Sequence, residues 1–289
     1  MPVFNGERHL AAAIESILGQ TCQDLELVVS DNASSDATPE ICQDYADADP
    51  RVRYTRLDRN VGARMNFEIV LSRARGEWFK WSAHDDLIRP EFLAGCLARL
   101  DHDRGAVLCA TDIEVIDDRG EQLGETLQPI TIDGRTPHER LRQFFAHPKV
   151  HQTIFGVIRR SVLDSTDLLG PWFGSDRELL MELALRGRFH RVDQLLFLHR
   201  EHPGRSDHVP SKVAYYTPER GDRPVAQHWR HLGRAARALL SAPMPAAERA
   251  RCLAEYGRRG RTLVGRWAPT MCREAATSVR TMSGFRVRR

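Results

Sequence analysis

Two adjacent carboxylates follow an apolar run in the first half of the chain. Asp85 and Asp86 end the segment Glu77-Trp-Phe-Lys-Trp-Ser-Ala-His-Asp-Asp, which we interpret as a strand of a parallel sheet. Open α/β sheets bind ligands outside the carboxyl ends of their strands. Mg²⁺ is commonly held by one or two protein carboxylates together with substrate phosphate oxygens. The pair therefore indicates a divalent cation beside a phosphate, although a solvated strand-to-helix turn can contain the same residues.

A second polar pair and a glycine loop point to the same kind of site. Asp31 and Asn32 follow the apolar segment 25–30, so they lie at the same predicted sheet edge. Their side chains could read a base through its ring N–H and carbonyl groups, or they could simply cap a strand end. In the loop Asn60-Val-Gly-Ala-Arg64, the glycine permits close backbone approach, and Arg64 can reach a diphosphate. The alternative for this loop is a plain helix entry.

The first 112 residues alternate between short apolar segments and segments with helical periodicity. We expect strands at 25–30, 52–57, 77–86 and 106–111, and helices at 10–18, from Thr38, from Met65 to a left-handed cap at Gly76, and from Pro90 to Leu100. Thr38, with proline and glutamate after it, is expected to cap its helix. Such alternation predicts an α/β fold with a mostly parallel central sheet flanked by helices.

The pattern changes after Thr111. We expect a hairpin around Asp118-Arg-Gly120, followed by two helices that open with capping boxes, at Thr136–Glu139 and at Ser175–Glu178. Further strands are predicted at 153–157 and 189–198, and only helices are expected beyond about residue 215.

Composition places the chain among globular proteins. It has 289 residues, of which 42% are hydrophobic and 28% charged, and no apolar run reaches the length of a membrane-spanning helix. No basic segment followed by an apolar core marks a secretory signal at the start. The six cysteines are scattered without a Cys-x-x-Cys pair, so neither a zinc site nor a disulfide framework is expected. A reducing cytoplasm is the simplest setting.

The net charge of +3 hides a basic C-terminal region. Residues 225–289 contain 14 arginines, no lysine and three acids. Such a region can attract an anionic membrane surface or nucleic acid, and it can equally be an ordinary helical face. We expect no nucleic-acid partner and keep peripheral membrane contact as a hypothesis.

An ordered series of motifs closely resembles glycosyltransferase family 2. The series runs through Asn5-Gly6, Ser16-Ile-Leu-Gly-Gln-Thr21, Glu26-Leu-Val-Val-Ser-Asp-Asn32 with Ser34, Asp36 and Thr38, Asn60-Val-Gly62, Arg64-Met-Asn66, Gly76-Glu77 and Asp85-Asp86. The similarity covers about residues 2–205. It implies the GT-A fold, which has a Rossmann-like sheet, and inverting transfer from a nucleotide-diphosphate sugar.

The resemblance implies roles in donor binding. Phe4, Asp31 and Asn32 match positions that contact the base, and Arg64 lies in the loop that faces base and diphosphate. The segment Arg200-Glu-His202 resembles one that closes over the diphosphate, which places His202 at the donor.

It also implies the metal site and the general base. Asp85 matches a position that holds the sugar or ribose, and Asp86 matches a ligand of Mg²⁺ or Mn²⁺. Asp176 matches the carboxylate that opens a late helix and takes the acceptor proton. A helix N-terminus would keep this acid ionised, and the alternative for Asp176 is a structural acid of the capping box.

The chain departs from the family pattern in three places. Met1 stands directly before Pro2-Val-Phe-Asn5, so most of the family's central first strand is absent. We expect a displaced start or a shortened chain, with exposed apolar faces in the sheet and reduced folding stability. Asn32 stands where the family often has a second acid. His84 precedes the acidic pair, where we expect it to pack beside Trp81 rather than to lie near a metal.

These observations predict a GT-A domain at 1–215 and a basic helical extension at 216–289. The nucleotide-binding half would end at about 112, and the acceptor half would follow. The expected activity is metal-dependent, inverting transfer of a sugar from a nucleotide-diphosphate donor to a saccharide or lipid-linked glycan in cell-wall or polysaccharide biosynthesis. The enzyme would be cytoplasmic, with peripheral contact to the inner membrane face.

Two alternatives stay open at this point. A nucleotidyltransferase of sugar phosphates also pairs an α/β sheet with metal-binding acids, but it usually has a glycine-rich loop after its first strand, which we do not find. A non-catalytic nucleotide-sugar-binding protein would keep the donor site without turnover.

Overall fold

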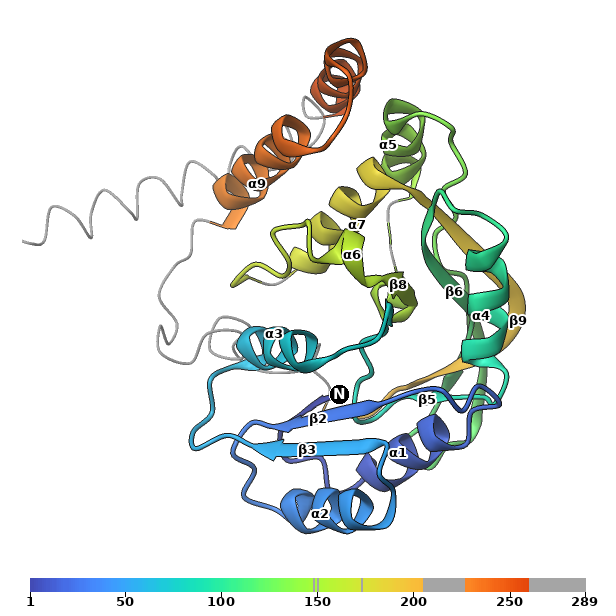
Figure 1. Ribbon diagram of the computed structural model, residues 1–289, viewed down its shortest axis with the longest axis vertical. Helices are drawn as coiled ribbons and strands as arrows, with labels where there is room; N and C mark the ends of the chain where they lie inside the picture. The colour runs from blue at the N-terminus through green and yellow to red at the C-terminus, as the bar shows by residue number, and fades with distance from the viewer. Residues whose placement is uncertain (148, 150, 173, 205–226, 260–289) are drawn as a thin grey trace, which may run out of the picture.

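The computed structural model describes residues 1–147, 149, 151–172, 174–204 and 227–259. Its first half is a three-stranded parallel sheet with strand order β1-β2-β3, of which Figure 1 shows β2 and β3 side by side. The strands and the helices that follow them are β1 (Pro2–Val3), α1 (Leu10–Leu18), β2 (Leu27–Asp31), α2 (Thr38–Ala48), β3 (Val52–Arg56) and α3 (Ala63–Arg73).

Helical periodicity explains how α1 covers this sheet. Leu10, Ala13, Ile14 and Ile17 recur three and four residues apart and are all buried in the same apolar cluster as Leu27 and Val29 of β2. One stripe of the helix therefore packs on the core, as the sequence predicts.

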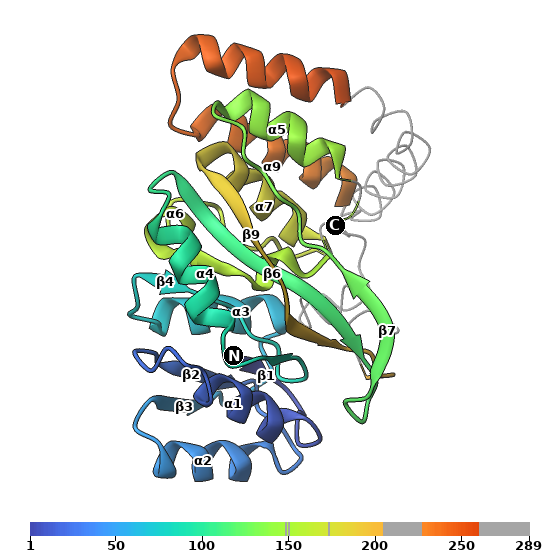
Figure 2. The same cartoon turned by 90° about the vertical axis from the view of Figure 1, so that its right-hand side faces the viewer.

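The second half is a mixed sheet with strand order β4-β8-β6-β9-β5, and β7 pairs with β6. Its strands are β4 (Trp78–Phe79), β5 (Leu87–Ile88), β6 (Ala106–Ile116), β7 (Gln122–Leu127), β8 (Val157–Arg159) and β9 (Arg188–Arg200). The long strands β6 and β9 run parallel, and the other pairs are antiparallel. Figure 2 shows β6 and β9 crossing the molecule side by side with the β6–β7 hairpin at one end. Among the described residues, the parallel pairs are β1 with β2, β2 with β3 and β6 with β9.

Helices flank the second sheet and continue beyond it. They are α4 (Phe92–Asp101), α5 (Pro137–Ala146), the 3₁₀ turn η1 (His151–Phe155), α6 (Arg160–Leu163), α7 (Ser175–Arg186) and α9 (Gln227–Ser241). The predicted capping box of α5 is present. The side chain of Thr136 accepts the backbone N–H of Glu139, and the side chain of Glu139 accepts the backbone N–H of Thr136. A further helical segment spans 246–259.

The predicted strand at 77–86 is wrong in length and direction. Only Trp78 and Phe79 form β4, which pairs antiparallel with β8. Trp81 instead turns into the core, where its indole N–H donates to the Phe67 carbonyl at 3.1 Å. The acidic pair consequently lies in the loop before β5 and not at the end of a parallel strand.

Other local predictions are also corrected. Thr38 is the first residue of α2, and its Oγ1 accepts the Gly6 N–H at 2.8 Å, so it does not cap its own helix. Helix α3 ends at Arg73 with Ala74 as its cap, and Gly76 plays no left-handed role. Residues 153–155 belong to η1 and not to a strand, because the strand begins only at Val157.

The capping box predicted at Ser175–Glu178 is wrong as well. The cap of α7 is Gly174, which has a φ of 83°. Glu178 is buried and accepts the indole N–H of Trp172 at 3.0 Å, so its carboxylate does not turn back to the helix start.

A groove of about 490 Å³ separates the two sheets. It is lined by residues of β2 and of the β4 region, among them Val28, Phe79 and Lys80. Strand β1 holds only two residues, and the amino group of Met1 donates to the Val28 carbonyl at 2.7 Å. Burial lowers the pKa of this amino group to about 5. Val28 and Phe79 line this groove and are nevertheless buried, with 7% and 8% of their surfaces exposed, so the expected exposure of apolar sheet faces is not seen at these two residues.

The C-terminal helices pack on the second half (Figure 1). Arg234 of α9 and Glu182 of α7 are both buried, and they form an ion pair with Nε–Oε1 at 3.0 Å. The predicted boundary at 215–216 lies outside the described residues. In the part of the chain that the structure describes, no helix has both the length and the apolar character needed to cross a membrane.

Candidate functional site

The acidic loop is held by the chain segment that follows β9. Nε2 of His202 lies 2.9 Å from Oδ2 of Asp85, although 117 positions separate the two residues. Burial raises the pKa of the Asp85 carboxyl, but the nearby His84 and the hydrogen bond from His202 outweigh it, so the pKa lies below its ordinary value. Asp85 is therefore an anion at neutral pH, which suits a cation ligand.

Asp86 faces the end of β9. Its Oδ1 accepts hydrogen bonds from Nδ1 of His199 at 3.0 Å and from the backbone N–H of Arg200 at 2.9 Å. The side chain is buried, with 8% of its surface exposed. Both bonds use Oδ1, so Oδ2 is the oxygen left for the predicted metal contact.

Arg200 joins the acidic loop to the β6–β7 hairpin. Its Nε donates to the Asp85 carbonyl at 2.8 Å, and its Nη1 donates to the carbonyls of Asp117 and Asp118 at 3.0 and 3.2 Å. The guanidinium is buried, and burial lowers its pKa from the ordinary value. Three carbonyls from two loops are thus fixed by one side chain, which sets the relative position of those loops.

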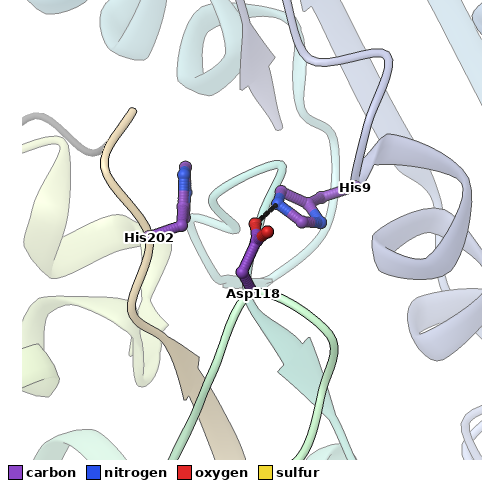
Figure 3. A group of neighbouring side chains, drawn as sticks. All are labelled: His9, Asp118 and His202. Atoms are coloured by element: carbon purple, nitrogen blue, oxygen red, sulfur yellow. Dashed lines mark hydrogen bonds and ion pairs between the residues drawn. The ribbon is translucent and has the colours of Figure 1, made fainter.

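A histidine and an aspartate from two other segments meet His202 at this place. His9, Asp118 and His202 offer nitrogen and oxygen atoms that all lie within 4.8 Å of one another (Figure 3). Burial, together with Arg200, His202 and Arg8, lowers the pKa of His9 to about 4. His9 is consequently a neutral imidazole at pH 7.

The predicted base-reading pair at Asp31 and Asn32 is engaged within the first half. Asp31 is fully buried, and its carboxylate accepts the Ser34 N–H at 2.9 Å and the Tyr54 hydroxyl at 3.2 Å. Asn32 uses both ends of its amide on the glycine loop, donating to Asn60 Oδ1 at 3.0 Å and accepting the Val61 N–H at 2.8 Å. Asn32 therefore shapes the glycine loop, and direct base contact by either residue stays a prediction.

Phe4 and Arg64 occupy different surroundings. Phe4 follows β1 and is 43% exposed, so its ring is accessible to a planar ligand. Arg64 lies at the start of α3, where Nε donates to the Leu169 carbonyl at 3.1 Å and Nη2 pairs with Glu68 at 2.9 Å. Its predicted diphosphate contact stays a prediction.

Asp176 stands on another element, in the first turn of α7. Its side chain is half-buried, and Glu178 of the same turn is engaged with Trp172. An acid in the first helical turn is stabilised as an anion by the helix N-terminus. This placement agrees with the predicted proton acceptor, although it does not test that role.

The structure thus joins Asp85, Asp86 and His202 in one contact network and leaves Asp31, Asn32 and Arg64 in others. Sequence reasoning missed His9, Asp118 and His199, and it named Arg200 only as the first residue of the segment that ends at His202. No spacing rule could have found them, because they come from the start of α1, the hairpin turn and the end of β9. The Arg200-Glu-His202 segment was the only signal. His84, which we expected beside Trp81, has its ring against Gly6, where an added Cβ would come within 2.7 Å of it.

Comparison with known sequences decides the family. The family described as "Glycosyl transferase family 2" matches residues 1–166, which is more than half of the chain. The chain belongs to glycosyltransferase family 2. The matched region contains the pair Asp31-Asn32, the glycine loop and the acidic pair Asp85-Asp86.

Named relatives of this family 2 chain come from several bacteria. An uncharacterized glycosyltransferase of Rickettsia prowazekii, RP339, is 30% identical over 204 residues, covering 69% of this chain and 60% of the relative. The succinoglycan biosynthesis protein ExoO of Rhizobium meliloti is 36% identical over 120 residues, covering 42% of this chain and 34% of ExoO. The chain spans between about a third and three fifths of the length of such curated relatives.

Solved structures share the fold of this family 2 chain. TarS 1–349 of S. aureus, in complex with UDP-GlcNAc, superimposes with a TM-score of 0.64 at 17% identity, covering 94% of this chain and 77% of that one. The mannosyltransferase PcManGT of Pyrobaculum calidifontis, in complex with GDP-Man and Mn²⁺, gives a TM-score of 0.52 at 16% identity, covering 99% and 86%. The predicted GT-A fold is confirmed.

Proposed function

We propose that the protein transfers a glycosyl group from a nucleoside-diphosphate sugar to an acceptor hydroxyl, with inversion at the anomeric carbon. The observation that carries this proposal is the acidic loop at 85–86, which His199, Arg200 and His202 hold in place from the end of β9. In a chain of glycosyltransferase family 2, a fixed pair of carboxylates can bind a divalent cation that also binds the diphosphate of the donor.

The acidic pair fits a divalent cation of the Mg²⁺ or Mn²⁺ type. Asp85 is ionised, and Asp86 has Oδ2 outside its two hydrogen bonds, so the pair offers the hard oxygen ligands that these ions prefer. Asp85 and Asp86 would hold the ion. When bound, such an ion neutralises the negative charge that grows on the leaving diphosphate.

The chain's own residues have separate tasks in this scheme. Asp176, kept ionised by the N-terminus of α7, accepts the proton of the attacking hydroxyl. Phe4 offers an exposed ring to the base, and Asn32 holds the glycine loop of the same half of the protein. His202 keeps Asp85 oriented toward the donor.

The acceptor belongs to this proposal at the level of its class. ExoO is named for succinoglycan biosynthesis, and we infer a saccharide or lipid-linked glycan as acceptor here. Exposed arginines of the C-terminal helices support contact with an anionic membrane surface from the cytoplasmic side, with Arg237, Arg251 and Arg258 between 62% and 74% exposed. Acids lie beside each of the three, which weakens this surface field.

Product analysis tests the reaction. The purified chain is incubated with a panel of UDP- and GDP-sugars and saccharide acceptors in Mn²⁺, Mg²⁺ or chelator, and nucleoside diphosphate, pyrophosphate and the anomeric configuration of the product are measured. We expect release of nucleoside diphosphate and an inverted product only with metal. Release of pyrophosphate would establish nucleotidyl transfer instead, and donor binding without any turnover would establish a non-catalytic protein.

Asp85→Asn sharpens this test. Removing a charge that stabilises the transition state costs about 100-fold in kcat/KM, or roughly 2.7 kcal/mol. Asp44→Asn on the exposed side of α2 is the matched control, and its kcat/KM should stay within about twofold of the wild-type value. Equal activity of Asp85→Asn and the control in the presence of Mn²⁺ would refute the role of the acidic loop.

A further inference from the structure

Helix α9 packs into the core of the second half, beside α7 (Figure 2). Its residues Ala235, Ala238 and Leu239 are buried in the same apolar cluster as Leu183 of α7. Apolar burial of this kind holds a helix against its neighbour without requiring any charge in the contact. The buried charged groups that α9 and α7 also share therefore need a separate explanation.

Two acids of α7 pair with basic residues of α9. Nε of Arg234 lies 3.0 Å from Oε1 of Glu182, and the two residues are 7% and 2% exposed. One turn nearer the start of α7, Glu178 is buried as well and pairs with Nδ1 of His231. A buried ion pair is a weak source of stability, because the cost of desolvation offsets most of the attraction. The geometry that these pairs impose is the better explanation for them.

Arg234 and Glu182 both bind the α6–α7 loop, by which we mean residues 166–172. Oε2 of Glu182 accepts the Asp167 N–H at 3.0 Å, and Nη2 of Arg234 donates to the Leu168 carbonyl. Leu168 has a φ of 54°, a left-handed conformation that residues other than glycine rarely adopt. Such a conformation persists only where surrounding contacts hold it, and Arg234 supplies one of them.

The same loop reaches the candidate base and the glycine loop of the first half. Oγ of Ser175 donates to the Gly170 carbonyl at 3.1 Å, which ties the loop to the first turn of α7, where Asp176 lies. Nε of Arg64 donates to the Leu169 carbonyl at 3.1 Å. The α6–α7 loop thus connects α9 with the helix turn that carries Asp176 and with the start of α3.

We propose that Arg234 of α9 is a positioning residue for the transfer reaction, because it fixes the α6–α7 loop and with it the first turn of α7. This inference rests on the proposed function, in which Asp176 accepts the proton of the acceptor. A general base must lie within hydrogen-bond reach of that proton, so a small displacement of the turn lowers the rate of the chemical step. Arg234 acts through the loop and not by contact with a substrate.

The planar guanidinium explains why an arginine stands at this position. It donates from Nε to Glu182 and from Nη2 to the Leu168 carbonyl at the same time. A lysine ammonium keeps the positive charge but is a single point on a flexible stem, so it does not reproduce this fork. Arg234→Lys should therefore retain the pair with Glu182 and loosen the loop.

Kinetics of Arg234→Lys test the proposal. We expect kcat of the folded variant to fall about 10- to 100-fold, while the KM for the nucleotide sugar stays within about twofold of the wild-type value. Arg259→Gln, at an exposed position of the last described helix, is the control and should keep both constants. Circular dichroism and Tm check that each variant is folded. A kcat equal to that of the control, or a change confined to the KM for the donor, would overturn the proposal.

Glu182→Gln approaches the same contact from α7. The amide keeps the size of the side chain and removes the charge that pairs with Arg234, so kcat should fall in the same direction. This variant decides the question if Arg234→Lys does not fold. An unchanged kcat in folded Glu182→Gln would contradict the positioning role of the pair.

Amide hydrogen exchange tests the contact without any reaction. In Arg234→Lys, the amides of the α6–α7 loop, Asp167 among them, should exchange at least about tenfold faster than in the wild type, while those of α1 stay unchanged. Equal exchange in the two proteins would show that Arg234 does not hold the loop. A wild-type chain that transfers no sugar would refute the proposed function, and the exchange rates would still decide whether Arg234 fixes the loop.

Discussion

The pairs Asp31-Asn32 and Asp85-Asp86 are held by different kinds of contact. Asp31 and Asn32 bond to groups within the first three strands and their loops, no more than 29 positions away. Asp85 and Asp86 bond to His199, Arg200 and His202, more than 110 positions away. The first pair therefore depends on local folding of the first half, and the second depends on contacts between the acidic loop and the end of β9.

This difference has a functional consequence. A site tied to the end of β9 forms only when both halves have folded, so the geometry of the acidic loop is coupled to the folding of the second half. The pair at the end of β2 would keep its geometry even if the contacts with the end of β9 were loosened. Disturbing each pair separately should consequently change different properties.

The largest effect is expected at Arg200. Arg200→Ala removes a buried guanidinium that binds three carbonyls and should lower the free energy of unfolding by about 3 kcal/mol. The folded fraction of this variant should also have a lower activity, because the acidic loop loses the hydrogen bond that Arg200 donates to the Asp85 carbonyl. Urea unfolding and donor kinetics measure the two effects. Arg104→Ala, at an exposed position, is the control, and equal stability of the two variants would contradict the coupling.

A smaller effect is expected at Asn32. Asn32→Ala leaves the Val61 N–H and Asn60 without their partner and should cost about 1–2 kcal/mol. The loop at 60–62 lies in the first half, so the KM for the donor should rise while kcat changes little. A loss confined to kcat would show instead that Asn32 acts on the reaction and not on the loop.

The smallest effect concerns an ion pair away from both sites. Hydrogen bonds from Arg188 and His190 hold the pKa of Asp103 well below its ordinary value. A carboxyl whose folded pKa is depressed stabilises the fold above its unfolded pKa, about 3.8–3.9, and this contribution is lost as pH falls through the lower folded value. Asp103→Asn should therefore cost about 1 kcal/mol at pH 7, because the pair is partly exposed, and the difference from wild type should shrink toward pH 2.

Urea unfolding across this pH range measures that last contribution. A difference between Asp103→Asn and wild type that stays constant from pH 7 to pH 2 would mean that the carboxyl does not act through its charge. Neither donor KM nor kcat should change in this variant, which makes it a reference for the effects at Arg200 and Asn32.

Several features of the fold follow from the sequence because they rest on local periodicity. The buried stripe of α1, the capping box of α5 and the turn at Asp118-Arg-Gly120 each depend on residues within a few positions of one another. Family motifs added the GT-A fold, because their order along the chain reflects the order of the elements. The residues of the candidate donor site were named from the same motifs.

Tertiary structure decided what those residues contact. The apolar run before Asp85 predicts a strand. Trp81 is instead buried in the core, and the strand pairing of β4 ends at Phe79. Glu178 fits a capping box, but its buried carboxylate accepts the indole N–H of Trp172, and the cap of the helix is Gly174. The meeting of His9, Asp118 and His202 depends on three chain segments folding together, and the free energy of such long-range packing leaves no periodic signal in the sequence.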